Sequence, residues 1–375
     1  MPLTEAQRIL LSVRSPPDDA PPLPVALPAS TIAAVKAYLG PSQPPSAWLA
    51  AGPRHFALSG AGVSLSYGGS VSVFHDTAPR VPFAAGTYAA SGSDLPHTPT
   101  VLTGVGAEWQ ALQGEGWSLP SLAARCSASD AFSLDGGPGF ARETLSVGSV
   151  SMAAFAEYAS GAAGGDSAPL YIFDDSLSTR CFADGTPMAS EFTIPACFSA
   201  DTMLSCAGGQ ARPLPPSWLL VGPSGSGTPV HSHPFTVGWC TLLHGTKLWV
   251  LLPPHVDPGL LQVGEHNTTS GEEDLSALQW MMQWGGGGEG LTLLQRAGET
   301  VFIPAGWWHV VLNVTVTVAL SHSLYLARDF AVHGMAASAE AQAVGSAWAA
   351  GVAGSAAEEG GGGGAGEKSQ AQVKI

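Results

Sequence analysis

Short apolar runs separated by turn-forming residues recur along most of this chain and restrict the folds open to it. Stretches such as Lys247–Leu252 and Thr300–Ile303 have strand length, and each is followed directly by proline. The 47 glycines and 30 prolines would interrupt long helices throughout the sequence. This pattern is typical of an antiparallel sandwich or barrel rather than of alternating βαβ units, so we predict a mainly β fold.

A few local elements can be predicted with their boundaries. Leu119–Cys126 and Ser276–Trp284 are predicted helices, and the glycine run Gly285–Gly288 after the second is interpreted as a loop insertion. Trp239–Leu252 is predicted to form a hairpin around a His-Gly-Thr turn, and Thr300–Asn313 a hairpin-like unit around a Pro-Ala-Gly turn.

The charge balance excludes a general nucleic-acid binder. The 375 residues contain 29 Asp and Glu against 14 Lys and Arg, which gives a formal net charge of −15. Phosphate neutralisation requires clustered Lys and Arg, so no direct nucleic-acid binding is expected. An acidic protein would instead attract a basic peptide or protein substrate over long range.

Cysteine usage and the apolar pattern indicate an intracellular protein. The five cysteines are odd in number and form no C-x-x-C pair, so neither a disulfide framework nor a zinc ribbon is predicted. The first thirty residues do not resemble a secretory signal, and no uninterrupted apolar stretch is long enough to cross a bilayer. We expect nuclear or cytoplasmic residence and no membrane association.

Three histidines form the candidate metal site. His231 and His233 are two residues apart, a spacing that places both side chains on one face of a strand. His309 follows a short apolar run and a Pro-Ala-Gly turn. Two ligands from one strand and a third from a distant strand are typical of a mononuclear non-haem iron site. Each histidine taken singly is more often a packed or solvated residue than a ligand, and it is their joint context that favours metal binding.

Lys247 is the only lysine between positions 37 and 367, and it lies in an apolar strand candidate beside Trp249. A buried ammonium is costly unless it meets an opposite charge. Inside a barrel, an acidic small molecule such as a dicarboxylate would supply that charge. The alternative is a lysine at a strand end whose ammonium reaches solvent.

Four stretches of the chain together resemble the JmjC (jumonji C) oxygenase family. They carry the motifs Tyr-Ile-Phe-Asp, His-Ser-His-Pro, Gly-Thr-Lys-Leu-Trp and Gly-Trp-Trp-His, within the ranges 168–174, 222–234, 239–254 and 298–313. The order and spacing are similar to those of the arginine demethylase/lysyl hydroxylase branch. The resemblance runs from about Thr98 to Phe330.

This resemblance implies a cupin-type double-stranded β-helix, or jelly roll, with flanking helices. It also implies Fe(II), 2-oxoglutarate and O2 as cofactor and cosubstrates. His231 and His309 match the family's histidine ligands, and Lys247 matches the lysine that pairs with the distal carboxylate of 2-oxoglutarate. Tyr171 matches a tyrosine that hydrogen-bonds the cosubstrate, and Ser321 stands where the family places a threonine. No catalytic residue beyond the metal centre is implied.

Two positions depart from the family pattern. The family motif is His-x-Asp or His-x-Glu, whereas this chain has His233 in the place of the carboxylate. Cys240 stands where the branch has an asparagine beside the cosubstrate, and it is either a cosubstrate contact or a small buried residue. Asp174 and Asp175 could be suspected as substitute ligands, but we interpret both as structural.

The leading hypothesis is therefore a 2-oxoglutarate-dependent dioxygenase that hydroxylates or demethylates protein side chains. The alternative is a degenerate, non-catalytic cupin that binds metal or a partner, because the motif is His-x-His. The expected divisions are a Pro/Gly-rich, partly ordered segment (1–95), the N-terminal part of the cupin fold (96–184), the JmjC domain (185–341) and an Ala/Gly-rich helix with a flexible tail (342–375). Further local expectations are helices at Thr31–Leu39 and Asp329–Ala357 and a strand at Val63–Tyr67.

Overall fold

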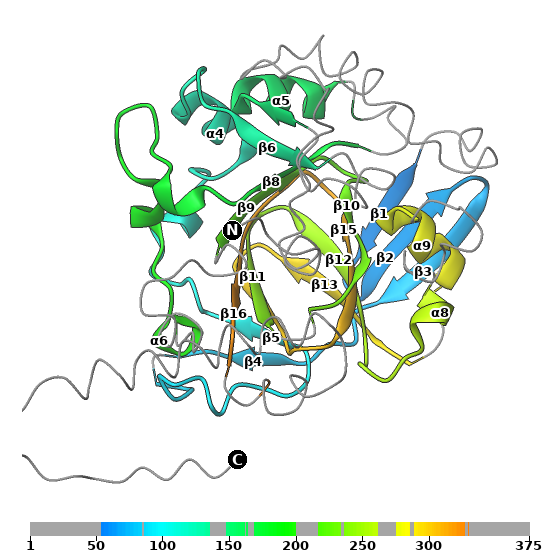
Figure 1. Cartoon of the computed structure of the whole chain (residues 1–375). Helices are drawn as coiled ribbons and strands as arrows, with labels where there is room; N and C mark the ends of the chain where they lie inside the picture. The colour runs from blue at the N-terminus through cyan, green and yellow to red at the C-terminus, as the bar shows by residue number, and fades with distance from the viewer. Residues whose placement is uncertain are drawn as a thin grey trace, which may run out of the picture.

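The structure, a computed structural model, describes residues 54–84, 86–135, 148–161, 163, 169–199, 217–233, 236–261, 275–285, 289–326 and 329. Within these residues, two mainly antiparallel sheets face each other and form a barrel (Figure 1). The predicted mainly β, jelly-roll fold is confirmed. None of the helices in these ranges has the length and apolar character needed to span a bilayer.

The larger sheet has nine strands. In spatial order they are β4 (Arg80–Pro82), β5 (Thr100–Thr103), β14 (Glu299–Ile303), β11 (Val237–His244), β16 (Thr317–Leu324), β9 (Ser217–Gly222), β8 (Tyr171–Asp174), β6 (Phe132–Asp135) and β7 (Gly148–Val150). The sheet that faces it has the order β10 (Gly227–His231), β15 (Trp308–Asn313), β12 (Thr246–Leu252) and β13 (Leu291–Arg296).

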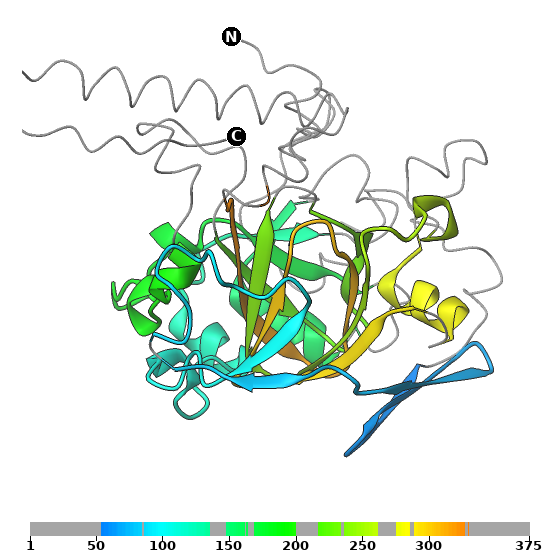
Figure 2. The same cartoon turned by 90° about the horizontal axis from the view of Figure 1, so that it is seen from below.

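Helices cover the outer faces of the barrel. Those described are α4 (Leu119–Arg125), α5 (Met152–Ser160), α6 (Ala196–Ser199), α8 (Pro258–Leu261) and α9 (Ala277–Trp284). Three short 3-10 turns lie at Gln110–Leu112, Leu177–Thr179 and Met188–Glu191. A third sheet of β1 (His55–Ser59), β2 (Gly62–Tyr67) and β3 (Ser70–His75) projects beside α9 (Figure 2).

Three apolar clusters follow from the alternation of side chains along the strands. One fills the space between the nine-stranded sheet and α4, α5 and α6, and another lies between the four-stranded sheet, α9 and the third sheet. The third cluster is the barrel interior, which includes Tyr171, Cys240, Trp249 and Val311. The strands are therefore apolar on both faces, which explains their nearly continuous apolar sequences.

The two predicted hairpins are wrong. β11 pairs with β14 and β16, whereas β12 pairs with β13 and β15, so the Trp239–Leu252 segment crosses from one sheet to the other. Likewise β14 pairs with β11 and β5, and β15 with β10 and β12. The Gly245 turn, with φ of 87°, redirects the chain across the barrel edge instead of reversing it within one sheet.

The predicted helices and the N-terminal strand agree with the structure. The first forms α4 and the second α9, and α9 begins with a capping box between Ser276 and Gln279. Gly285 ends α9 in the left-handed conformation, with φ of 66°. β2 covers the predicted strand. The helix at Thr31–Leu39 and nearly all of the one at Asp329–Ala357 lie outside the described residues.

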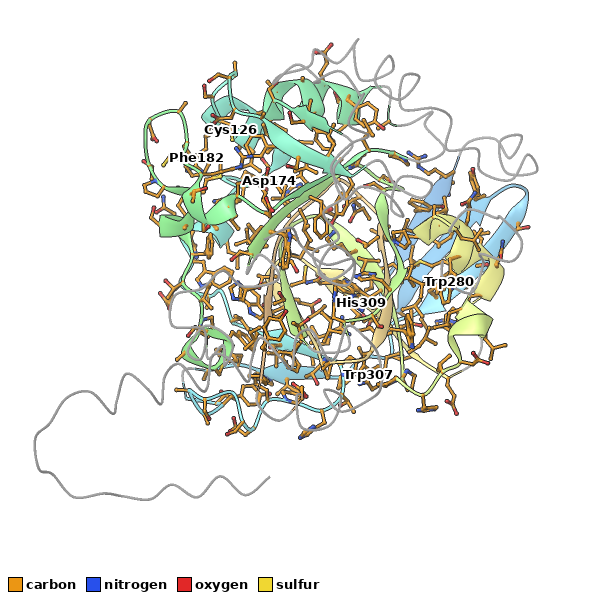
Figure 3. All side chains as sticks on the ribbon, viewed as in Figure 1. Cys126, Asp174, Phe182, Trp280, Trp307 and His309 are labelled. Atoms are coloured by element: carbon orange, nitrogen blue, oxygen red, sulfur yellow. The ribbon has the colours of Figure 1, made fainter. Side chains whose placement is uncertain are left out.

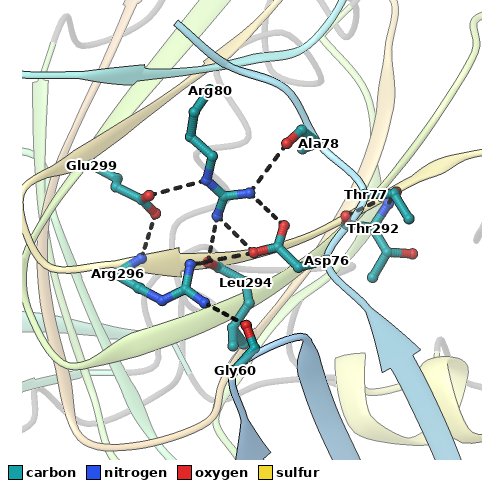
Figure 4. Close-up of polar contacts among 9 residues, drawn as sticks. All are labelled: Gly60, Asp76, Thr77, Ala78, Arg80, Thr292, Leu294, Arg296 and Glu299. Carbon is teal, nitrogen blue, oxygen red and sulfur yellow. Dashed lines mark hydrogen bonds and ion pairs between the residues drawn. The ribbon is translucent and has the colours of Figure 1, made fainter. Parts of the chain in front are cut away.

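A network of four charged side chains joins the segment after β3 to the β13–β14 turn (Figure 4). Arg80 donates to both carboxylate oxygens of Asp76, at 2.6 and 2.7 Å, and to Glu299 at 3.1 Å. Arg296 lies 3.3 Å from Asp76, and its backbone N–H donates to Glu299. The Asp76 side chain is 8% exposed, so it depends on these partners for compensation of its charge.

Replacing Arg80 with alanine is expected to lower the free energy of unfolding by about 2 kcal/mol, because Asp76 would lose a bidentate partner in a mostly buried position. Arg296→Ala is the matched control. Its guanidinium side chain is 45% exposed and makes a longer contact, so a loss below about 1 kcal/mol is expected. Urea unfolding of both variants measures the difference. Equal losses would show that the bidentate contact has no special weight.

Candidate metal centre and lysine pocket

The structure brings the three predicted histidines together at one end of the barrel. His231 ends β10 and lies opposite His309 of β15 in the strand register. The candidate ligand nitrogens of His231, His233 and His309 all lie within 4.8 Å of one another. Figure 3 labels His309 near the middle of the barrel and Trp280 to its right, on the covering helix α9.

His233 reaches this position by a route other than the predicted one. β10 ends at His231, so the two histidines do not share a regular strand. The backbone carbonyl of His233 instead accepts a hydrogen bond from Gly306 N–H at 2.8 Å. Gly306 lies in the turn before β15 with φ of 79°, a conformation that favours glycine. The turn that leads to His309 therefore also anchors His233.

Hydrogen bonds define the tautomers of two of the histidines. Nδ1 of His231 lies 2.8 Å from the carbonyl oxygen of Pro229, and Nδ1 of His309 lies 3.0 Å from that of Trp307. A carbonyl only accepts, so each Nδ1 carries the proton and each Nε2 keeps a lone pair. This is the second-sphere arrangement that orients imidazole ligands toward a metal.

Burial also keeps the imidazoles neutral. Desolvation lowers the pKa of His231 and, together with its two histidine neighbours, lowers the pKa of His309 well below its ordinary value. The pKa of His233 is lowered as well, by local desolvation and by His231, although this residue is the most exposed of the three. Neutral imidazole is the form that binds metal.

Lys247 lies deeper in the barrel and is 1% exposed, so its ammonium does not reach solvent. Its Nζ donates to Asn313 Oδ1 at 2.6 Å and to Tyr171 OH at 3.0 Å. Burial lowers the lysine pKa to about 8. Among the described residues, no carboxylate forms an ion pair with it.

Asn313 and its supporting residues were not predicted from the sequence. Asn313 Nδ2 donates to Ser226 Oγ at 2.8 Å, and the Ser226 hydroxyl donates to the Pro223 carbonyl at 2.7 Å. Strand parity was the available signal for Asn313, because it lies four residues after His309 on the same strand face. Ser226 lies in a loop, where the sequence offers no such signal.

Glycine is required at position 222, where the lysine pocket closes. A Cβ on Gly222 would lie 2.3 Å from Asn313 Nδ2, 2.4 Å from Ser226 Oγ and 2.6 Å from Tyr171 Cδ2. These separations are shorter than nonbonded contacts, so an alanine would displace the hydrogen-bonded cluster. The backbone thus leaves room for the amide and the hydroxyl that hold the lysine.

The other predicted cosubstrate residues line the same interior. Cys240 is 1% exposed, and burial raises its thiol pKa to about 11, so it is a neutral group beside the lysine. Ser321 lies opposite Cys240 in the β11–β16 register, and its hydroxyl has a weak 3.5 Å contact with the Trp239 carbonyl. Tyr171, 2% exposed, faces the lysine from β8.

Gln295 is a second residue that the sequence did not reveal. Its Oε1 accepts from Trp249 Nε1 at 2.8 Å, and its Nε2 donates to the Cys240 carbonyl at 2.8 Å. Trp249 in turn stacks on the His309 ring with centroids 6.2 Å apart. Gln295 therefore fixes the indole that lies along the barrel between the histidines and Lys247.

Asp174 and Asp175 are separate from the histidines in their contacts. Asp174, fully buried, binds Arg180 through two hydrogen bonds of 2.8 and 2.5 Å and accepts the backbone N–H groups of Ser133 and Ser176. Asp175 is exposed. The carboxylate of Asp174 is thus occupied by structural partners, and Figure 3 places it on the β8 side of the molecule.

The donor set fits a divalent iron-type ion. His231 and His309 each present an unprotonated Nε2, and the His233 ring lies close to both. Imidazole nitrogens of this kind suit iron and the other first-row transition metals. The interior below them ends at an ammonium without an anionic partner among the described residues, which fits the carboxylate of a small acid. The candidate metal site and the lysine pocket therefore lie within one barrel.

Comparison with known proteins agrees with this geometry. The family profile described as "JmjC domain, hydroxylase" matches residues 218–324. The chain is 33% identical over 168 residues to "Bifunctional arginine demethylase and lysyl-hydroxylase psr-1" of Caenorhabditis elegans, covering 42% of this chain and 40% of that protein. It is 33% identical over 165 residues to "Arginine-specific demethylase JMJ22" of Arabidopsis thaliana, covering 41% of this chain and 30% of that protein.

A third similar protein is "2-oxoglutarate and iron-dependent oxygenase JMJD4" of Danio rerio, 31% identical over 110 residues, which are 28% of this chain and 26% of that protein. The chain thus spans less than half the length of each of these relatives. The matched region runs from β9 to β16 and includes all three histidines and Lys247. Residues 218–324 of the chain therefore match the JmjC domain family.

Proposed function

We propose that the protein is an Fe(II)- and 2-oxoglutarate-dependent oxygenase that acts on protein side chains. The observation that carries this proposal is Lys247. A barrel interior has no structural need for a buried ammonium, yet this one is held by Asn313 and Tyr171 along the barrel from three clustered histidines. Such a pair of sites suits a ligand that offers a carboxylate to the lysine and chelating oxygens to a metal.

In this proposal His231, His233 and His309 hold the iron, and Lys247 with Tyr171 holds the distal carboxylate of 2-oxoglutarate. Ser321 and Cys240 line the cosubstrate's binding space. When bound, iron with 2-oxoglutarate and O2 supplies the oxidising chemistry, and the keto acid ends as succinate and CO2 while one oxygen atom is inserted into a substrate C–H bond. The residues of the chain orient both groups, and Trp249 and Val311 restrict water between them.

The substrate class is proposed from the relatives and from charge. Two of the similar proteins are named as arginine demethylases, one of them also as a lysyl hydroxylase. A net charge of −15 favours a basic peptide or histone-like segment by long-range attraction. Hydroxylation and demethylation share the same first step, because a hydroxylated N-methyl group loses formaldehyde.

A succinate assay tests the proposed function. Protein loaded anaerobically with Fe(II) is exposed to O2 and 2-oxoglutarate, with and without a pool of lysine- and methylarginine-containing peptides. Wild-type protein is expected to form succinate faster than Lys247→Ala, and faster still with the peptides. If the two proteins formed succinate at the same rate under both conditions, the oxygenase proposal would be abandoned.

His233 supports a second candidate, a metal-binding cupin without turnover. Three neutral imidazoles leave a bound Fe(II) with a higher net charge than two imidazoles and a carboxylate, which changes oxygen activation. His233→Asp distinguishes the two candidates in the same assay. Turnover that appears only in this variant would favour the binding module, whereas turnover already present in wild type would favour the enzyme.

A further inference from the structure

We propose that Asn313 is the positioning residue of the lysine pocket. It holds the Lys247 ammonium through a neutral oxygen, so that the positive charge remains available to a carboxylate of a bound ligand. This inference rests on the proposed function, in which that ligand is 2-oxoglutarate. It assigns a role to a residue that neither the sequence motifs nor the metal site had identified.

The direction of a hydrogen-bond chain fixes the orientation of the Asn313 amide. The Ser226 hydroxyl donates to the Pro223 carbonyl at 2.7 Å, so its oxygen is left to accept. Asn313 Nδ2 donates to that oxygen at 2.8 Å. The amide oxygen must then face Lys247, where it accepts from Nζ at 2.6 Å. A flipped amide would place two donors against each other at the lysine.

The backbone holds the amide equally firmly. Asn313 is fully buried, its N–H donates to the Ser226 carbonyl at 2.8 Å, and its own carbonyl accepts from Gly225 N–H at 2.8 Å. Gly222 leaves only enough space for the amide and the Ser226 hydroxyl. The amide is thus pre-organised before any ligand arrives, which lowers the entropic cost of binding.

The neutrality of Asn313 matters because, among the described residues, no acidic side chain contacts the Lys247 ammonium. Its described neighbours include the Tyr171 hydroxyl, which accepts from Nζ, and the Cys240 thiol, whose pKa is raised to about 11 by burial. An aspartate at position 313 would have the same shape and would place a carboxylate where Oδ1 now lies. That carboxylate would pair with the ammonium and replace the carboxylate of the ligand.

Asn313→Asp in Co(II)-loaded protein tests the inference by calorimetry with two probes, 2-oxoglutarate and 2-oxobutyrate. The second probe keeps the keto acid and lacks the distal carboxylate. Wild type is expected to prefer 2-oxoglutarate by about 30-fold or more, the usual scale for a buried charge pair. In Asn313→Asp the preference should fall to about threefold or less, because the internal carboxylate already occupies the lysine. Co(II) affinity is measured as a control and should match wild type, and a cooperative thermal transition shows that the variant is folded.

Ser226→Ala provides a second test that leaves all charges unchanged. It removes the acceptor that orients the amide, so the same preference should fall about tenfold. A preference retained in both variants would overturn the role of Asn313 and leave the proposed function intact. Wild-type protein that binds the two probes equally would overturn the inference itself. Failure of the proposed function is separate, because it appears as absent succinate formation whatever the binding preference.

Discussion

Replacing His309 with alanine is expected to lower the affinity for Fe(II) by about 1000-fold, well beyond the 10- to 100-fold typical of losing only a partner of a ligand. His309 is 5% exposed, its Nδ1 is committed to the Trp307 carbonyl, and its Nε2 lone pair has two other imidazoles within reach. Removing it leaves two nitrogens, one of them on the loop beyond β10. Anaerobic equilibrium dialysis against Fe(II) measures the loss.

His244→Ala is the matched control for this experiment. His244 also lies on a barrel strand, but it ends β11 at the other end of the barrel and contacts Glu115 at 3.5 Å. Its removal should leave iron affinity unchanged. Unchanged affinity in His309→Ala would exclude the three-histidine site as the place where iron binds.

Replacing Lys247 with methionine is expected to weaken 2-oxoglutarate binding by about 100-fold or more, because truncating one partner of a buried charge pair leaves the other uncompensated. Methionine retains the length and apolar character of the lysine stem, so the neighbouring Trp249 and Val311 keep their packing. Metal affinity should not change, because the lysine lies four register positions from His309 along β15. Binding to Co(II)-loaded protein, measured by calorimetry, tests both statements.

The affinity for 2-oxoglutarate should also depend on pH. Burial lowers the Lys247 pKa to about 8, so the ligand-free lysine loses its proton as the pH rises through 8. A neutral amine attracts a carboxylate weakly, so affinity should fall by up to about tenfold per pH unit above 8. The Lys247→Met variant should show no such decline. A wild-type affinity that stays constant from pH 7 to 10 would contradict a buried ammonium as the binding group.

The lowered pKa of Lys247 also makes the stability of the folded protein depend on pH. In the unfolded chain the lysine pKa is near 10.5, and in the folded, ligand-free protein it is about 8. The depressed folded value means that charged Lys247 opposes folding, on the order of 3 kcal/mol, at all pH values below 8. This penalty is relieved as the pH rises from about 8 to 10.5. A bound dicarboxylate would offset it, so ligand should stabilise the protein most below pH 8.

Local sequence determined the elements and several site residues. The strand and helix positions followed from apolar runs, prolines and the glycine after α9, because these act within a few residues. His231, His309 and Lys247 could be selected because their residue types are chemically unusual in apolar strands. The alternation of side chains along a strand could also have placed Asn313 on the same face as His309. A lone asparagine at a strand end, however, does not indicate a function by its residue type.

Tertiary structure decided how the strands pair and what surrounds each site residue. The sequence suggested hairpins for Trp239–Leu252 and Thr300–Asn313, and in the folded barrel both segments cross between sheets. A tight turn is compatible with either path, and burial of both strand faces, against the covering helices and against the opposite sheet, selects one.

Lys247 shows most clearly what the sequence left open and the tertiary structure decided. From the sequence, Lys247 was either a solvent-reaching residue at a strand end or an ion-pairing group inside a barrel. Its 1% exposure and its bond to Asn313, 66 residues away, remove the first possibility. Such contacts depend on chain segments that meet only when the barrel closes, because the energy of a buried charge is set by its neighbours in space and not by those in sequence.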